Sequence, residues 1–426
     1  MEAELRMIHK NDTWELVDRP ANRNGYNQQH GIDFFETFVP VAMLDTIRLL
    51  FALAAQKQWK VHQLDVKSVF LNRFIKEEIF VEQPDGFKAP RAWYDRIDAY
   101  LSRLGFEKSI SEPTFYVKKV KIETLLIVSL YVDDLLVTGC RSELIKNFKK
   151  QLQDVFEITD LGLMTYFIGM EVNQNEHFIF ISQQVFALKV LNNFCMTNCK
   201  PASTPVALGE KLSSNSDHDR VDEKSYRSLI GCLLYLTATR PDIMYAVSLL
   251  SRFMHCCNIA HFKVAKRVLR YVKGTLGYGV KFERAKELKL VGYSDSDWSS
   301  KKRQTIAQST AEAEYIAVAT AVDQAIWLKK LLSDLNVDQV EATKTKVDNQ
   351  SVVAIAKNPV FHGKTKHFKV KYHFVREAEL SKEINFIHCC SKVQLTDILT
   401  KPLAALRFEY LKKEIRVCCF VAKEEC

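Results

Sequence analysis

Glycine and proline are scarce in this chain of 426 residues, with 14 and 10 residues respectively. Long flexible linkers and low-complexity repeats consist largely of these two residues, so the sequence excludes both as major parts of the protein. A run of about 18 uncharged apolar residues, the length that spans a membrane, is also missing. Charged residues close to the N-terminus interrupt any apolar segment of a secretory signal. We therefore expect an intracellular protein of the cytoplasm or the nucleus, with no signal peptide and no transmembrane segment.

Cysteine is well represented, but it lacks the patterns of a disulfide framework and of a zinc site. The 11 cysteines include three adjacent pairs, at 256–257, 389–390 and 418–419. Adjacent cysteines suit neither a set of disulfides nor the two close ligand pairs of a structural zinc site. We therefore expect free thiols in a reducing compartment.

The rest of the composition is that of a globular protein. Hydrophobic residues make up 47% of the chain and charged residues 26%, and a chain of this length contains roughly two or three domains. Lys and Arg exceed Asp and Glu by 60 to 51, which gives a formal net charge of +9. This mild excess is compatible with a polyanionic partner but does not require one.

Hydrophobic periodicity predicts several helices and strands. Apolar residues at helical spacing predict a buried helix over 46–58, and the next stretch, 59–70, has the pattern of a strand that runs into a turn. Two apolar runs around residues 133 and 134 predict a hairpin over 125–138. A polar connector over 196–222 is the best domain boundary, and a helical block follows it over 226–273. From residue 287 onward, strands alternate with helices, which predicts an α/β unit.

The most informative short motif is Asp133-Asp134, at the tip of the apolar hairpin. Two carboxylates in such a place are costly unless a cation neutralises them. Magnesium prefers oxygen ligands of this kind, and Asp65, at the end of a predicted strand, offers a third carboxylate. Two metal ions about 3.5–4 Å apart can promote phosphoryl transfer. From the dipeptide alone, an ordinary turn is the favoured interpretation, because Asp is common in turns.

A second set of acids lies in the C-terminal part of the chain. Asp295 follows a strand-like segment, and Glu314 lies on the apolar face of a predicted helix. Asp348 lies at a strand-to-helix junction, and Asp397 belongs to the segment 396–402. Each acid alone would be interpreted as a helix cap or a surface group.

Basic residues recur at intervals of three and four in the helical block. Such a stripe would suit contacts with nucleic-acid phosphates, and it would equally suit a solvated helix face. Its members are Lys263, Lys266, Arg267, Arg270 and Lys273.

Several longer segments closely resemble the reverse transcriptase of copia-type LTR retrotransposons. The segments are QLDVKSVFLN at 63–72, EIFVEQPDGF at 78–87, LYVDDLLVTG at 130–139, YFIGME at 166–171, YRSLIG at 226–231 and TRPDI at 239–243. They follow the family's order and extend over nearly the whole chain. The resemblance therefore concerns the Pol polyprotein of these elements, in which a ribonuclease H domain follows the polymerase.

The resemblance implies an α+β and α/β architecture with a reverse-transcriptase palm and partial fingers, a helical connection and a truncated ribonuclease H-like domain. We expect a remnant of the fingers at 1–30, the palm and fingers at 31–200, a linker at 201–224, a helical thumb or connection at 225–285, the ribonuclease H-like domain at 286–404 and a tail at 405–426.

The resemblance also implies roles for single residues in the polymerase. Asp65 and Asp133 would bind two Mg²⁺ ions, with Asp134 beside them. Phe70 would lie under the sugar of the incoming deoxynucleoside triphosphate and exclude a 2′-hydroxyl, although a Phe is more often a core residue. The partners would be an RNA template, a DNA primer and the RNA–DNA hybrid.

In the ribonuclease H part, the resemblance implies a second two-metal site that cleaves the RNA strand of the hybrid. Its ligands would be Asp295, Glu314, Asp348 and Asp397. The matching segment KHFKVKYHFVRE at 366–377 places His367 and His373 either near the substrate or at packed or surface positions.

The chain departs from the family pattern at three joins, which indicate internal deletions. At Asn24 a fingers segment rich in Lys and Arg is missing, and at Phe87 a segment that positions template and nucleotide is shortened. At Trp298 two strands of the ribonuclease H sheet are absent, which would expose a sheet edge. Two hypotheses follow: a polymerase joined to a hybrid-specific ribonuclease, impaired by the deletions, or a catalytically inactive relic that at most binds nucleic acid.

Overall fold

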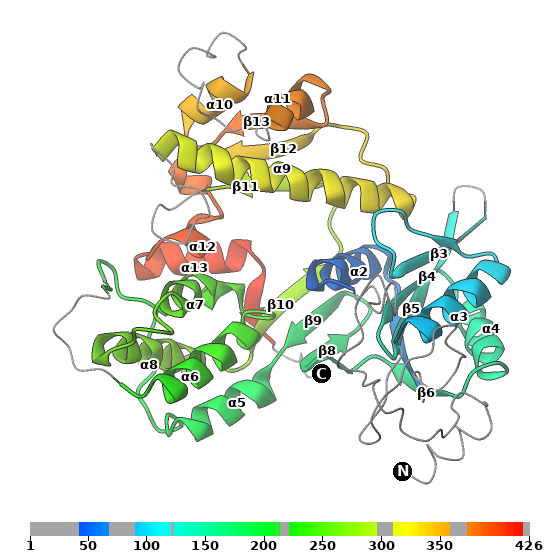
Figure 1. Ribbon diagram of the computed structural model, residues 1–426, viewed down its shortest axis with the longest axis horizontal. Coiled ribbons are helices and arrows are strands. Elements are labelled where there is room, and N and C mark those ends of the chain that lie inside the picture. The colour runs from blue at the N-terminus through cyan, green and yellow to red at the C-terminus, as the bar shows by residue number, and fades with distance from the viewer. Residues whose placement is uncertain are drawn as a thin grey trace, which may run out of the picture. The chain divides into compact units, whose positions relative to one another are not determined.

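The computed structural model divides into two compact units, and each is described by itself (Figure 1). Unit 1 comprises residues 1–164 and 331–337, and unit 2 comprises residues 165–330 and 338–426. The structure describes residues 42–67, 90–120, 123–210, 212–213, 221–295, 310–357 and 373–420. Among these residues, no helix is both long enough and apolar enough to cross a membrane.

Unit 1 contains a six-stranded antiparallel sheet in the order β2-β3-β4-β5-β1-β6. Its strands are β1 (Val61–Val66), β2 (Glu107–Lys108), β3 (Phe115–Val120), β4 (Glu123–Tyr131), β5 (Asp134–Gly139) and β6 (Ile158–Leu163). The predicted hairpin over 125–138 is confirmed as β4 and β5, and β1 lies beside β5. The central position of β1 and β5 brings the segments of the first acid motif together.

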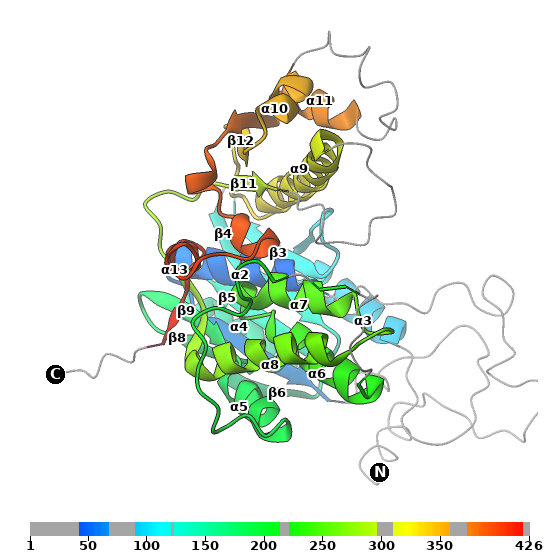
Figure 2. The same cartoon turned by 90° about the vertical axis from the view of Figure 1, so that its left-hand side faces the viewer.

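Helices cover both faces of this sheet (Figures 1 and 2). They are α2 (Leu44–Lys57), α3 (Pro90–Arg103) and α4 (Ser142–Gln153). Trp93 and Ile97 of α3 and Phe148 of α4 form a core with one face of the strands, whereas α2 lies on the other face. The helix predicted over 46–58 is confirmed as α2, with Ile47 and Leu50 fully buried.

Unit 2 begins with a five-stranded antiparallel sheet in the order β14-β10-β9-β8-β7. The strands are β7 (Tyr166–Phe167), β8 (Met170–Gln174), β9 (Phe178–Ser182), β10 (Tyr278–Glu283) and β14 (Val417–Cys419). The helices of this part are α5 (Gln184–Asn193), α6 (Glu223–Leu236), η3 (Pro241–Ile243), α7 (Met244–Ser251) and α8 (Ile259–Gly274). The helical block predicted over 226–273 is thereby confirmed. Asp222 caps α6 by accepting hydrogen bonds from the backbone amides of Lys224 and Ser225.

A buried ion pair joins the elements of the helical block. Arg240 and Asp242, each less than 4% exposed, have Nη2 and Oδ2 2.8 Å apart. The Tyr271 hydroxyl of α8 donates to Asp242, and Arg240 donates to the backbone and the side chain of Thr275. Because every charged atom has a partner, this network fixes η3 against α8 at little cost in unsatisfied polar groups.

The rest of unit 2 contains a parallel sheet of three strands, β11-β12-β13. The elements of this part are β11 (Val291–Ser294), α9 (Thr310–Asp334), β12 (Thr343–Val347), α10 (Gln350–Lys357), α11 (His373–Leu380) and β13 (Ile384–His388). The end of α9, from Leu331 onward, belongs to unit 1. Val318 and Val322 of α9 pack with Val347 and Phe386 of the strands in one core. The predicted alternation of strands and helices after residue 287 is confirmed. Within the described residues β11 has a strand neighbour on one side only.

The last elements of the chain return to the helical block. They are η6 (Ser391–Val393), α12 (Asp397–Thr400) and α13 (Ala405–Glu414), followed by β14. Ile398, Phe408 and Leu411 belong to the same hydrophobic core as α6, α7 and α8. This core, rather than that of the parallel sheet, therefore fixes the position of α12.

Candidate functional site

The first acid motif lies on a turn whose backbone conformation is strained. Val132 and Asp133 form the two-residue turn between β4 and β5. Val132 has a φ of 55°, a left-handed conformation that is unfavourable for a β-branched residue. The Val66 amide donates to the Asp133 carbonyl over 2.9 Å, and the Trp93 indole donates to the Val132 carbonyl over 3.1 Å. These two hydrogen bonds hold the turn in place.

Three carboxylates meet beside this turn. Asp65 of β1 is the cross-strand partner of Asp134 of β5, so their side chains share one face of the sheet. Gln63 donates to Asp134 Oδ1 over 2.8 Å. Burial raises the pKa of Asp134, this hydrogen bond opposes the rise, and the negative charges of Asp133 and Asp65 add to it. None of the three forms an ion pair with another described residue, so the described part of the chain provides no counterion for this acidic group.

Several predicted positions of the polymerase and ribonuclease H parts fall outside the described residues. Phe70 is one of them, and so are the joins at Asn24, Phe87 and Trp298. His367 also lies outside, and for His373 only the backbone is described.

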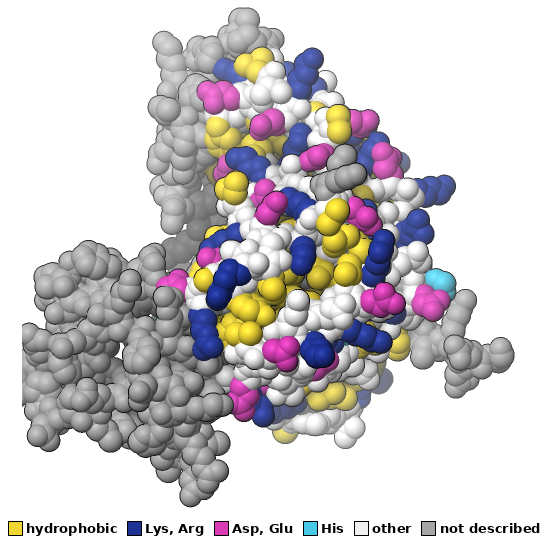
Figure 3. Space-filling model, turned by 90° about the vertical axis from the view of Figure 1, so that its right-hand side faces the viewer, with side chains coloured by type: hydrophobic (Ala, Val, Ile, Leu, Met, Phe, Trp, Pro, Cys, Tyr) yellow, Lys and Arg dark blue, Asp and Glu magenta, His cyan; other side chains and the backbone are white. Residues whose placement is uncertain are grey.

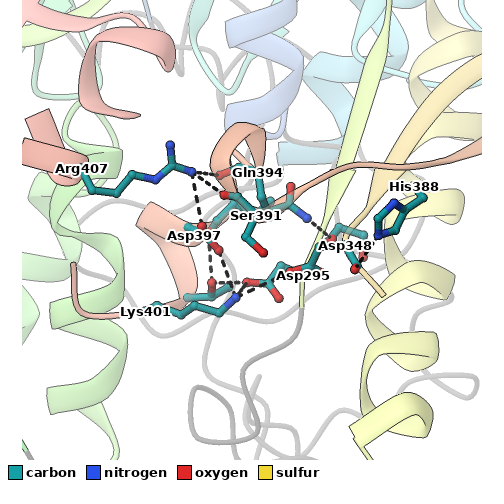
Figure 4. A network of polar contacts seen from close by, with 11 residues as sticks. Asp295, Asp348, His388, Ser391, Gln394, Asp397, Lys401 and Arg407 are labelled. Atoms are coloured by element: carbon teal, nitrogen blue, oxygen red, sulfur yellow. Dashed lines mark hydrogen bonds and ion pairs between the residues drawn. The ribbon is translucent and has the colours of Figure 1, made fainter. Parts of the chain in front are cut away.

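The residues of the second acid set lie on elements that belong to two different hydrophobic cores of unit 2. Figure 4 shows three of them, Asp295, Asp348 and Asp397. Asp295 and Asp348 directly follow the parallel strands β11 and β12, whose carboxyl ends lie at one edge of the sheet. Glu314 lies in the second turn of α9. Asp397 is the first residue of α12, which belongs to the core of the helical block.

A lysine side chain occupies the centre of this acidic group. Lys401 Nζ lies 3.0 Å from Asp295 Oδ2, 3.0 Å from Asp397 Oδ1 and 3.8 Å from Asp348 Oδ2 (Figure 4). Thr400 also donates a hydrogen bond of 2.5 Å to Asp295. Burial opposes the charge of Lys401, but hydrogen bonds to Asp397 and Asp295 outweigh it and raise its pKa. The role of Lys401 was not predictable from the sequence, because nothing in its local pattern sets it apart.

The remaining acids of this group have unfavourable surroundings for a negative charge. Burial and the neighbouring charges of Asp348 and Asp295 raise the pKa of Glu314, against a hydrogen bond from Asn349. Burial and Asp295 likewise raise the pKa of Asp348, against the charge of Lys401. Glu314 Oε2 and Asp348 Oδ1 are buried and accept no hydrogen bond from any residue that the structure describes. Each thus keeps a free oxygen that a cation could bind.

Two further residues position the acids. Arg407 Nη2 lies 3.4 Å from Asp397 Oδ2 and donates to the carbonyls of Ser391 and Gln394 (Figure 4). The Gln394 side chain donates to the carbonyl of Ser294, beside Asp295, over 2.9 Å. The segment before α12 is thereby tied to the end of β11.

The donor chemistry of both acidic groups fits a hard divalent cation, which prefers carboxylate oxygens. As the side chains lie, no set of three or more His, Cys, Asp or Glu residues in the described ranges has the geometry of a metal site. At the first group the uncompensated charge favours a cation. At the second, the free oxygens of Glu314 and Asp348 do so, although the ammonium of Lys401 is already present. Side-chain rearrangement would therefore accompany metal binding.

The basic stripe on α8 is divided between two environments. Lys263 and Lys266 are exposed. The other three donate to the connector before α6: Arg267 to the Thr204 hydroxyl, Arg270 to the Lys200 carbonyl, and Lys273 to the Thr197 carbonyl. Lys263 and Lys266 are therefore the members most accessible to a partner, although Lys266 Nζ also lies 5.0 Å from the centre of the Phe262 ring.

Comparison with known proteins gives matches along most of the chain. The family model described as reverse transcriptase (RNA-dependent DNA polymerase) matches residues 18–89 and 87–208. The Pol polyprotein of transposon RE2 from Arabidopsis thaliana is 33% identical, over 92% of this chain and 30% of its own length. The Pol polyprotein of transposon TNT 1-94 from Nicotiana tabacum is 32% identical, over 97% of this chain and 37% of its own length.

A third relative is a shorter protein that aligns over about half of this chain. An uncharacterized mitochondrial protein of Arabidopsis thaliana, AtMg00810, is 37% identical over 46% of this chain and 92% of its own length. The chain spans about a third of the length of the Pol polyproteins that it matches. Together with the family model, these matches confirm the resemblance found in the sequence: the chain belongs to the reverse transcriptase family of copia-type retrotransposon Pol polyproteins.

Proposed function

We propose that this chain is the reverse transcriptase and ribonuclease H portion of a copia-type Pol polyprotein, with one metal-dependent phosphoryl-transfer site in each part. The observation that carries the proposal is the group of Asp65, Asp133 and Asp134. It joins two separate segments of the family pattern on adjacent strands and lacks a counterion among the described residues. Uncompensated acids at one end of a sheet are costly unless a cation binds there.

In the polymerase part, Asp65, Asp133 and Asp134 would hold Mg²⁺. The bound ions would supply activation of the primer hydroxyl and stabilisation of the leaving oxygen. The chain's own contribution is to fix the carboxylates: Gln63 orients Asp134, and Trp93 holds the strained turn before Asp133. Phe70 would select deoxynucleotides from its position five residues after Asp65.

In the nuclease part, Asp295, Glu314, Asp348 and Asp397 would hold Mg²⁺, which would activate water against the RNA strand of a hybrid. Support comes from the convergence of all four acids, which influence one another's charge or share Lys401. The strand order β11-β12-β13 would correspond to the parallel half of a ribonuclease H sheet.

The nucleic-acid partners would be bound mainly through phosphate contacts. Lys263 and Lys266 on α8 are exposed and suited to such contacts. On the face shown in Figure 3, Lys and Arg are interspersed with Asp and Glu and form no continuous basic band. Binding on that face would thus owe little to long-range electrostatic attraction.

A catalytically inactive relic is the second candidate, and specific observations favour it. The alignment with the TNT 1-94 polyprotein is 494 positions long, which exceeds the 426 residues of this chain. That relative therefore carries residues that this chain lacks. The family model matches in two segments that meet at residues 87–89, at the predicted second join. The described part of the third sheet has three strands, with one side of β11 unpaired.

The polymerase proposal is tested by primer extension on an RNA template. With Mg²⁺, the chain should extend a DNA primer, and Asp133→Asn should abolish extension because the site loses a ligand charge. Asp154→Asn, an exposed acid after α4, is the matched control and should keep full activity. Extension that persists in Asp133→Asn would remove Asp133 from the polymerase site.

The nuclease proposal needs a separate substrate, a labelled RNA–DNA hybrid. Asp348→Asn should abolish cleavage of the RNA strand and leave primer extension intact. Asp323→Asn, an exposed acid on α9, should do neither. If the unaltered chain neither extends nor cleaves but binds the hybrid with an affinity that falls steeply with salt, the relic is the correct assignment.

A further inference from the structure

The two acidic groups differ in one respect that bears on how each would take up a cation. The acids beside the β4–β5 turn form no ion pair within the described ranges. Those beside β11 and β12 surround the ammonium of Lys401, which lies within 4 Å of three carboxylates. One ammonium thus serves three carboxylates, so Lys401 neutralises this acidic group only in part.

The acids are buried, and the lysine reaches them from the solvent side. The side chains of Asp295, Asp397 and Asp348 are 3%, 9% and 15% exposed, whereas that of Lys401 is 38% exposed. Removing a partner from buried charges is strongly unfavourable. The metal-free chain therefore depends on Lys401 to keep these carboxylates together.

The same geometry lets the ammonium leave. Lysine carries its charge on a flexible four-carbon stem, and Lys401 follows the last residue of α12. Asp397 lies one helical turn before it, so the two can separate by side-chain rotation alone. Arg407 and Gln394 hold Asp397 and the end of β11 independently of Lys401. The acids would thus keep their places while the lysine moves out.

We propose that Lys401 is a resident counterion of the acidic group formed by Asp295, Asp348 and Asp397, and that a divalent cation binds there only by displacing it. Lys401 is then a positioning residue that stabilises the empty site and weakens cation binding by competition. This inference rests on the proposed nuclease site. This exchange distinguishes the nuclease site from the acids of unit 1, which form no ion pair with a lysine in the described ranges.

The test measures Mn²⁺ binding by calorimetry in the full chain carrying Asp133→Asn and Asp134→Asn, so that only the second group contributes. Lys401→Met should bind Mn²⁺ at least about tenfold more tightly than this parent, because a competing unit charge is removed. Lys401→Arg keeps the charge and should bind no more tightly than the parent. Lys413→Met removes an exposed lysine of α13 and should have no effect.

A second readout is the melting temperature, measured first in EDTA and then with Mn²⁺. In EDTA, Lys401→Met should melt at a lower temperature than the parent, and Mn²⁺ should raise its melting temperature more than it raises that of the parent. In an Asp295→Asn background, the destabilisation by Lys401→Met should shrink. Equal or weaker Mn²⁺ binding by Lys401→Met would overturn the exchange, and an unchanged melting temperature in EDTA would overturn the counterion role.

Failure of the underlying function has a different signature. Suppose that neither the parent nor Lys401→Met binds Mn²⁺, and that Asp348→Asn does not change cleavage of the RNA–DNA hybrid. The proposed metal-dependent nuclease is then wrong, and so is the proposed exchange of Lys401 for a cation. The counterion role is then still decided by the melting temperatures in EDTA.

Discussion

At the scale of single residues, His62 of β1 couples stability to pH. Lys149 Nζ lies 3.1 Å from His62 Nδ1 and 2.7 Å from Asp160 Oδ1. Because an ammonium can only donate, Nδ1 of the neutral imidazole accepts this hydrogen bond, and protonation of Nδ1 would break it. Burial lowers the pKa of His62 below its ordinary value of 6.5, and the charge of Lys149 lowers it further, against Asp160. The folded chain therefore binds fewer protons than the unfolded chain below about pH 6.5.

Because the unfolded chain binds more protons in this range, unit 1 should lose stability as the pH falls from about 6.5 to the lowered pKa of His62. His62→Gln should remove that part of the pH dependence. His177→Gln, which alters an exposed histidine in the β8–β9 turn, should retain it. Urea denaturation at a series of pH values is the measurement. If the free energy of unfolding changes with pH equally in the unaltered chain and in His62→Gln, the coupling is refuted.

At the scale of elements, the β7–β8 turn is fitted to α6 by one glycine. Gly169 has a φ of 72°, and a Cβ there would lie 1.6 Å from the Tyr235 hydroxyl, which donates to the Ile168 carbonyl. Gly169→Ala should therefore destabilise unit 2 by about 2–3 kcal/mol, through strain and a displaced tyrosine. Gly209→Ala is the matched control, because its φ is 78° but no atom lies within 4 Å of its Cβ.

Gly209→Ala should lower the free energy of unfolding by about 1 kcal/mol, the part due to the positive φ alone. Chemical denaturation of both variants separates the two contributions. Equal losses would show that the contact with Tyr235 contributes nothing.

Elements were predictable from the sequence where the information is local. The β4–β5 hairpin and α2 follow from apolar patterns within about 15 residues. The candidate acids could likewise be found from their positions near the ends of predicted elements. The positions of Trp93 and Lys401 were not predictable, because each depends on packing between segments far apart in the chain. The positive φ of Val132 was likewise hidden, since the sequence pattern of the turn does not require it. Domain boundaries remain a prediction.

At the scale of the molecule, the helical core of unit 2 is completed by the segment after the parallel sheet. Leu411 of α13 is fully buried in that core, whereas Leu406 of the same helix is 90% exposed. Leu411→Ala should lower the free energy of unfolding of unit 2 by about 2–5 kcal/mol, and Leu406→Ala should leave it nearly unchanged. Thermal unfolding of the two variants, side by side, makes the comparison. Similar melting temperatures would argue against α13 as part of this core.

The pairing of β14 with β10 has a consequence for how the protein is made. Val417 of β14 lies opposite Val280 of β10. During synthesis, β10 therefore emerges more than 130 residues before the strand that pairs with it. While a ribosome translates the intervening region, one edge of β10 is unprotected and the apolar sides of α7 and α8 lack the cover of α13. Chaperone binding to nascent chains should accordingly persist until residue 419 has emerged, and a premature stop codon in this region would yield a product prone to aggregation.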